Sequence, residues 1–290
     1  MKISKWKIAA FLTPCILLFS LVFVLPMLII FVTSFFEWKA GGIFNFVGLA
    51  NYISAFTSDK RMHQAIINTL IWVALQSTIH VALGTLIAYL LSMKVKGWKV
   101  FRTIYMIPNV ISSSVLAVIL VNVFRAKGGL VNGMITKITG TPFTKNWFFD
   151  SETAFITVTL TWLIYTGLVV IIALAGFMSV PDEILDAARI DGTSDLQLLF
   201  RIKLPLIRTV LGTCVILAAT SKLTEFELIY LTTGGGPGDM TINLPLYLYK
   251  TSMIDNNYGY ASMMSVILVL FGVICVFVIS RLFRMSESDI

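Results

Sequence analysis

Nine polar or aromatic side chains lie inside long apolar blocks of this chain, where such groups need a physical reason. They are Asn68, Gln76, His80, Asn109, Trp162, Tyr165, Lys222, Glu225 and Glu227. Polar groups in apolar surroundings are costly, and they usually face a cavity or pair with one another. Amide, carboxylate, ammonium and aromatic groups together can hydrogen-bond and stack against a polar solute. We therefore take these nine residues as candidates for the path of such a solute.

Two pairs among them have the spacing of neighbours on a helix. Gln76 and His80 are four residues apart and share one helical face. We interpret His80 as a buried histidine with satisfied hydrogen bonds in preference to a proton relay. Lys222 and Glu225 are three residues apart, and two interpretations stay open. Either the two charges neutralise each other, or they contact the solute.

The sequence offers no chemistry for a metal site or an enzyme. It has two histidines and three cysteines, and Cys15, Cys214 and Cys275 all lie in apolar blocks without ligand spacing. The glycine-rich stretch Gly234–Gly238 lacks the Gly-Lys-Ser/Thr ending of a phosphate-binding loop. We expect the chain to bind no metal and no cofactor, and not to hydrolyse ATP itself.

Six apolar blocks must position the candidate residues. The chain is 57% hydrophobic and 13% charged, whereas soluble domains carry about 25% charged residues. A helix of about 20 apolar residues crosses a bilayer. The sequence predicts an all-α integral membrane protein, with spans at about 9–34, 64–92, 103–124, 153–178, 207–232 and 259–281. The first block is too long for a cleaved signal peptide, so we expect it to be retained.

The positive charges predict the orientation in the membrane. Lys and Arg gather on cytoplasmic loops, and the short basic turn Lys94–Arg102 carries the clearest signal. This places both termini in the cytoplasm. The same distribution of Lys and Arg explains the net charge of +7. We therefore expect the basic residues to lie near membrane lipid and not to bind nucleic acid.

A polar segment, residues 179–206, separates the fourth and fifth blocks on the predicted cytoplasmic side. Pro181 suits the start of a helix, and Gly192 can adopt the left-handed conformation that ends it. Ser194 and Gln197 have the spacing of a capping box, which starts a second helix. We expect Pro205 to end that helix. The segment is predicted to form a helix–turn–helix that is amphipathic on both arms.

The same segment resembles the EAA motif of permease subunits of ATP-binding-cassette importers. The residues that carry the resemblance are Asp186-Ala187-Ala188, Asp191-Gly192 and Ile202-Lys203-Leu204-Pro205. Asp186 stands where glutamate is usual, and Thr193 stands where alanine is usual. The resemblance implies that Asp186, Ala187, Ala188, Asp191 and Gly192 contact a cytoplasmic ATPase.

Further stretches resemble the carbohydrate-uptake branch of this family, and its first permease of the pair. They are Val47–Tyr52, Asn68-Thr69, Phe226–Tyr230, Gly235–Pro237 and Tyr258–Ser262. The resemblance implies a single permease domain over residues 1–290 in a prokaryotic cell membrane. It also implies four kinds of partner: a second permease, two ATPase subunits that bind ATP and Mg, an extracytoplasmic sugar-binding protein, and lipid.

Other functions remain as alternatives to sugar import. A glycerol-phosphate-ester importer would use Lys222 for the phosphate, although Glu225 and Glu227 nearby favour a neutral sugar. An ion-coupled secondary transporter would explain six spans and buried charges but not the cytoplasmic helix–turn–helix. A membrane-embedded enzyme would need a nucleophile or a metal cluster, and the spans contain neither pattern.

Overall fold

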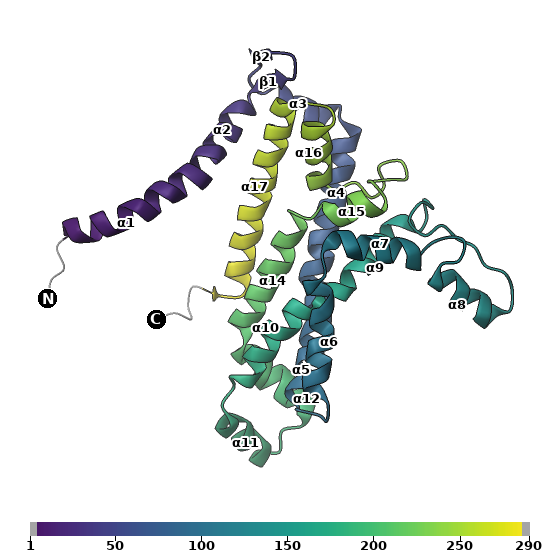
Figure 1. Cartoon of the computed structure of the whole chain (residues 1–290). Helices are drawn as coiled ribbons and strands as arrows, with labels where there is room; N and C mark the ends of the chain where they lie inside the picture. The colour runs from purple at the N-terminus through teal and green to yellow at the C-terminus, as the bar shows by residue number, and fades with distance from the viewer. Residues whose placement is uncertain (1–4, 286–290) are drawn as a thin grey trace. The chain divides into compact units, whose positions relative to one another are not determined.

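The computed structural model describes residues 5–285, which fold almost entirely into helices (Figure 1). Contacts divide the chain into two compact units. The smaller unit contains the residues up to Met62 together with Tyr247–Leu270. The larger unit contains His63–Leu246 and the residues from Phe271 onward.

The smaller unit begins with a long apolar helix and continues in a hairpin. Its elements are α1 (Lys5–Phe19), the π-helical segment η1 (Ser20–Val24), α2 (Leu25–Thr33), β1 (Phe36–Lys39), β2 (Ile43–Phe46), α3 (Ala50–Thr57), the start of α4 (Lys60–Leu75), the end of α16 (Leu244–Met253) and the first half of α17 (Tyr258–Leu282). The two strands pair antiparallel, with Phe36 opposite Phe46. The hairpin was not among the elements expected from the sequence.

One carboxylate joins three segments of the smaller unit. Asp59, between α3 and α4, accepts hydrogen bonds at Oδ2 from the hydroxyls of Tyr247 and Tyr260, each at 2.7 Å. Its Oδ1 accepts a bond from the backbone amide of Met62 at 3.0 Å. Burial alone would raise the pKa of the Asp59 carboxyl. The hydrogen bonds outweigh burial because they stabilise the ionised form, and the pKa lies below its ordinary value.

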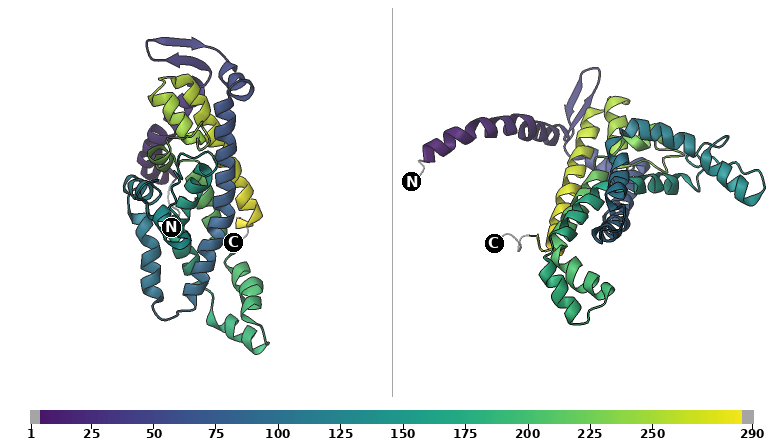
Figure 2. Two further views of the ribbon diagram at one scale, coloured as in Figure 1. Left: turned by 90° about the vertical axis from the view of Figure 1, so that its right-hand side faces the viewer. Right: turned by 60° about the horizontal axis from the view of Figure 1, so that its bottom comes forward.

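The larger unit consists of helices whose central members α5, α10 and α14 pack against one another (Figure 2). Besides most of α4 and the start of α16, its elements are η2 (Gln76–His80), α5 (Val81–Ser92), α6 (Trp98–Val110), α7 (Ser113–Val123), α8 (Leu130–Thr139), α9 (Ala154–Thr161), η3 (Trp162–Thr166), α10 (Gly167–Met178), α11 (Asp182–Ile190), α12 (Asp195–Gln197), η4 (Leu198–Lys203), α13 (Leu204–Leu206), α14 (Arg208–Lys222) and α15 (Glu227–Thr232).

Glycine lets two of these helices approach closely. A Cβ on Gly84 of α5 would lie 2.6 Å from Cγ1 of Val169 on α10, which is too close for two carbon atoms. The small residue therefore permits the contact. The packed helices α5 and α10 then fix the neighbouring segments η2 and η3, which carry several of the candidate polar residues.

Four helices are long and apolar enough to cross a membrane. They run over Phe11–Thr33, Lys60–Ser92, Ala154–Met178 and Tyr258–Leu282. Two further helix pairs pass the same test but are strongly bent: Trp98–Val110 with Ser113–Val123, by 100°, and Asp195–Leu206 with Arg208–Lys222, by 74°. The described residues thus hold four to six candidate spans.

Two of the expected spans are not continuous helices. The block at 103–124 bends at Ile111, where the chain becomes extended and Ser112 caps the next helix. The block at 207–232 ends as a helix at Lys222 and restarts at Glu227. The second helix of the hairpin ends at Leu206, one residue past the Pro205 expected to end it. Pro205 lies inside α13, and the chain bends after it, at Ile207.

Candidate functional site

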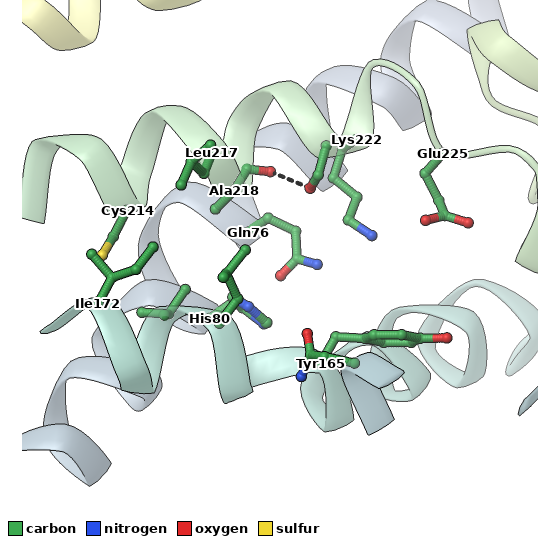
Figure 3. A pocket seen from close by; sticks show the side chains of 13 residues that line it. Gln76, His80, Tyr165, Ile172, Cys214, Leu217, Ala218, Lys222 and Glu225 are labelled. Carbon is green, nitrogen blue, oxygen red and sulfur yellow. Dashed lines mark hydrogen bonds between the residues drawn. The ribbon is translucent and has the colours of Figure 1, made fainter. Parts of the chain in front are cut away.

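A cavity of about 160 Å³ lies within the larger unit, among α14, η2 and the η3–α10 helix (Figure 3). Six of the nine candidate residues line it, namely Gln76, His80, Asn109, Tyr165, Lys222 and Glu225. The rest of the wall is Leu168, Val169, Ile172, Cys214, Leu217, Ala218 and Ser221. Polar groups thus gather on a wall that is otherwise apolar, as in a site that orients a bound solute.

Three irregular stretches of helix carry the polar groups to this cavity. Gln76 and His80 are the two ends of the π-helical segment η2. Tyr165 lies in the 3-10 segment η3, where its own backbone departs from helical geometry. Lys222 is the last residue of α14, and Glu225 follows in the break before α15. Such interruptions change the direction of side chains and are frequent at functional sites.

Lys222 is the buried cation of the cavity. Its side chain is 6% exposed, and its Nζ lies 3.8 Å from the centroid of the Trp162 ring. An ammonium group over an aromatic face is stabilised by the negative face of the ring. In the part of the chain that the structure describes, Lys222 forms no ion pair with Glu225. The charge of Glu225 still acts on Lys222 over a longer distance, so the two interpretations of this pair differ in whether a solute comes between the charges.

The two glutamates near Lys222 are already engaged by other donors. Oε1 of Glu225 accepts a hydrogen bond from the backbone amide of Leu228 at 3.3 Å, at the start of α15. Oε1 of Glu227 accepts a bond from the Ser114 hydroxyl at 2.6 Å and does not line the cavity. These carboxylates hold the break between α14 and α15 in place.

The remaining candidates divide into cavity residues and residues elsewhere. His80 lines the cavity, and its Nδ1 atom is buried without a hydrogen-bond partner. The sequence had instead predicted a buried histidine with satisfied hydrogen bonds. Asn68 lies away from the cavity, where Nδ2 donates to the carbonyls of Met240 and Ile242 at 2.9 and 2.7 Å. Trp162 is buried beneath Lys222 and does not line the wall.

Sequence reasoning missed two polar members of the wall. Ser221 and Cys214 belong to α14, one and eight residues before Lys222. From the sequence, Cys214 was noted only as a cysteine in an apolar block without ligand spacing. Cys214 lies eight residues before Lys222 and seven before Ser221, and this spacing was the available signal, because positions seven or eight residues apart lie on one face of a helix.

The second candidate site is the helix–turn–helix at residues 182–206. Gly192 has φ of +80°, the left-handed conformation expected from the sequence. The predicted capping box is present: the Ser194 hydroxyl accepts from the Gln197 amide at 3.4 Å, and the Gln197 side chain accepts from the Ser194 amide at 3.0 Å. α11 and α12 project from the end of α10 (Figure 1).

The inner face of this hairpin is part of the protein's own core. Leu185 and Ala188 of α11 are buried in one cluster with Leu198, Leu199 and Phe177. The outer face is exposed and carries apolar side chains that none of residues 5–285 covers: Ile184, Ile190, Leu196 and Phe200. Of the five expected coupling residues, Asp186, Ala187, Asp191 and Gly192 are exposed, whereas Ala188 is buried.

Comparison with known proteins places most of the chain in one family. The family model described as "Binding-protein-dependent transport system inner membrane component" matches residues 80–289. The chain is 32% identical to the osmoprotective compounds uptake permease protein GgtC of Synechocystis sp., over 96% of this chain and 99% of that protein. It is 31% identical to the multiple sugar-binding transport system permease protein MsmF of Streptococcus mutans, over 80% of each chain.

A solved structure shares the fold. A chain of the bacterial alginate ABC transporter, crystallised in complex with alginate pentasaccharide-bound periplasmic protein, superposes with a TM-score of 0.83. The match covers 98% of this chain and 96% of that chain at 21% sequence identity. At this identity the likeness concerns the arrangement of the helices.

Proposed function

This chain belongs to the family of binding-protein-dependent transport system inner membrane components, and we propose that it is a permease subunit of an ATP-driven sugar importer. It is an integral protein of the inner membrane. The relatives named for sugar transport, such as MsmF and the arabinooligosaccharides permease AraP, support sugar as the cargo. The observation that carries the proposal is the exposed helix–turn–helix attached to a helical unit with a polar cavity.

Residues 1–290 act as one permease domain with six spans and both termini in the cytoplasm. This count takes each of the two bent helix pairs as one broken span. Broken helices are tolerated in membranes where other parts of the protein satisfy the free backbone groups. A second permease completes the translocation pathway, and lipid covers apolar helices such as Phe11–Thr33.

The helix–turn–helix binds a cytoplasmic ATPase subunit as an EAA motif. Asp186, Ala187, Asp191 and Gly192 are accessible to such a partner, together with the exposed Ile190. Ala188 does not contact the partner and instead packs α11 against the hydrophobic core. Since the hairpin is held by buried residues of α10, a movement of the ATPase is transmitted to the membrane helices. ATP and solute then act at distinct sites on one conformational equilibrium.

The cavity provides this chain's part of the sugar path. Gln76, His80, Asn109 and Tyr165 offer hydrogen bonds, and Lys222 and Glu225 offer charge. Asn68, Trp162 and Glu227 support the path from outside the wall. Two separate ATPase subunits bind ATP and Mg, this chain binds no cofactor, and an extracytoplasmic binding protein delivers the sugar.

Uptake by the assembled transporter in cells or vesicles tests this function. Sugar accumulation is expected to require ATP, to stop with vanadate and to persist when ion gradients are collapsed. Accumulation that survives vanadate but disappears with the ion gradient would identify a secondary transporter instead. A complex that assembles normally and moves no sugar in the presence of ATP would exclude the proposed function.

A further inference from the structure

We propose that Lys222 recognises an anionic group of the transported solute, so that the cargo is an acidic sugar bearing a carboxylate, sulfonate or phosphoryl group. This inference rests on the proposed function and specifies its substrate class. It departs from the neutral sugar that the nearby Glu225 and Glu227 suggested from sequence alone.

The first observation is the environment of the Lys222 ammonium group. The side chain is 6% exposed, lines the cavity and has the Trp162 ring as its neighbour at 3.8 Å. The ring stabilises the cation from one side but cannot accept a conventional hydrogen bond from all three N–H groups. Within the described residues no oxygen accepts a bond from Nζ. A buried charge in this state favours a ligand that brings an acceptor oxygen.

The second observation is that the neighbouring carboxylates serve other donors. Glu227 accepts a bond from Ser114 at 2.6 Å and lies off the wall. Glu225 lines the cavity, but it accepts from the Leu228 amide and makes no ion pair with Lys222. Neither carboxylate contacts the ammonium group, although the charge of Glu225 acts on it over a longer distance. A solute anion can take the position that a protein carboxylate would otherwise occupy.

The third observation is the character of the other polar groups around the cavity. Gln76 and Asn109 carry amide N–H donors, Tyr165 carries a hydroxyl, and Nδ1 of His80 is buried without a partner. Figure 3 shows Gln76, Tyr165 and Glu225 around the end of the Lys222 side chain. Hydroxyl groups of a sugar would satisfy these neutral groups. An anionic oxygen would supply both an acceptor and a countercharge to Lys222.

The test is uptake by the assembled transporter with a size-matched panel of sugars. It contains neutral oligosaccharides, the corresponding uronic-acid and sulfonated sugars, and glycerol phosphodiesters. The wild-type transporter is expected to take up acidic members only. Lys222→Met, which keeps a long unbranched side chain but removes the charge, is expected to raise KM for the acidic sugar by about tenfold to a hundredfold. Lys222→Arg is expected to retain most of the uptake.

Two controls separate charge recognition from damage to the fold. Lys137→Met removes an exposed lysine of α8, and its KM is expected to equal that of the wild type. Glu225→Gln removes a carboxylate from the cavity wall, and it is expected to lower KM for the acidic sugar. Each variant is checked for membrane assembly and for basal ATP hydrolysis by the complex.

The outcomes distinguish this inference from the function on which it rests. Neutral sugars taken up in preference to their acidic counterparts would overturn the assignment of Lys222 and leave the importer intact. An unchanged KM for the acidic sugar in Lys222→Met would do the same. Loss of all ATP-driven uptake in the wild-type complex would overturn the proposed function together with this inference.

Discussion

The ammonium nitrogen of Lys222 lies 3.8 Å from the centroid of the Trp162 ring, and both side chains are buried. Lys222 ends α14, whereas Trp162 begins η3, so the contact joins two separate helical segments at the cavity. The ring also packs edge-on against Trp72, with centroids 4.6 Å apart, which fixes its orientation. The position of Lys222, the one lysine among the described residues of the cavity wall, thus depends on an aromatic pair.

Replacing the ring beneath Lys222 is expected to weaken solute recognition. Trp162→Leu removes a desolvated cation–π contact worth about 2 kcal/mol, which corresponds to a rise in KM of roughly 30-fold. Trp162→Phe keeps an aromatic face and is expected to show a smaller rise. KM for uptake is measured on variants with comparable melting temperatures. Equal KM values for the leucine variant and the wild type would contradict a role of the ring.

Asp59 is expected to make the smaller unit sensitive to acid. Its folded-state pKa is lowered, so its stabilising contribution is present at pH values above its unfolded pKa of about 4 and is lost as the pH falls through the folded pKa. At pH 7, Asp59→Asn is expected to lower the free energy of unfolding by about 1–3 kcal/mol. The difference between the two proteins should shrink toward pH 3, as followed by thermal unfolding in detergent.

Asp255→Asn is the matched control for that experiment. Asp255 is exposed, and the same substitution there removes a charge but no hydrogen bond to Tyr247 or Tyr260. Its melting temperature should stay near that of the wild type. A loss of stability in Asp59→Asn that is the same at all pH values would show that the ionised carboxylate is not the source of the stabilisation.

A methyl group at Gly84 is expected to separate α5 from α10. The added Cβ would lie 2.6 Å from Cγ1 and 2.8 Å from Cβ of Val169, and overpacking of this kind costs about 1–3 kcal/mol. Gly84→Ala should therefore lower the melting temperature, and adding Val169→Ala should restore part of it. Gly133→Ala in α8 meets nothing within 4 Å and should be neutral or stabilising. Additive effects of the Gly84 and Val169 substitutions would disprove the contact.

Gly192 is expected to matter because of its backbone conformation and not because a larger side chain would clash there. A Cβ there meets nothing within 4 Å, but φ is +80°, which β-branched residues adopt at a cost of about 1–3 kcal/mol. Gly192→Val should leave the protein in the membrane and abolish sugar-stimulated ATP hydrolysis. Gly192→Asn should retain it, because asparagine tolerates the left-handed region. Full stimulation in the valine variant would argue against a coupling role for this turn.

Signals that depend on local sequence were read correctly. The helix expected at 259–281 is present as α17 at Tyr258–Leu282, one of the candidate spans. The Ser194–Gln197 capping box and the left-handed Gly192 also follow from residue types at fixed spacing. In each case a few neighbouring residues determine the conformation, so one sequence is sufficient.

The breaks in the helices escaped prediction because hydropathy does not detect them. The block expected as a span at 207–232 contains Lys222, Glu225 and Glu227, and the helix ends at Lys222. Beyond this end, Glu225 accepts from the Leu228 amide and Glu227 accepts from the Ser114 hydroxyl. Ser112 was an available signal as the cap of α7. The β1–β2 hairpin also had a signal in the sequence, the pair Gly41-Gly42. These glycines form its turn with φ values of +95° and +89°.

Cys214, buried on the cavity wall, gives the protein a built-in chemical reporter. Cys15 is exposed and Cys275 is partly exposed, and neither lines the cavity, so their labelling can be recorded separately. A small thiol reagent that modifies Cys214 has entered the cavity that we propose as part of the solute path. The rate of Cys214 modification would be measured with the reagent on one side of the membrane and then on the other. The faster rate would show toward which side the cavity is open at each stage of the ATP cycle.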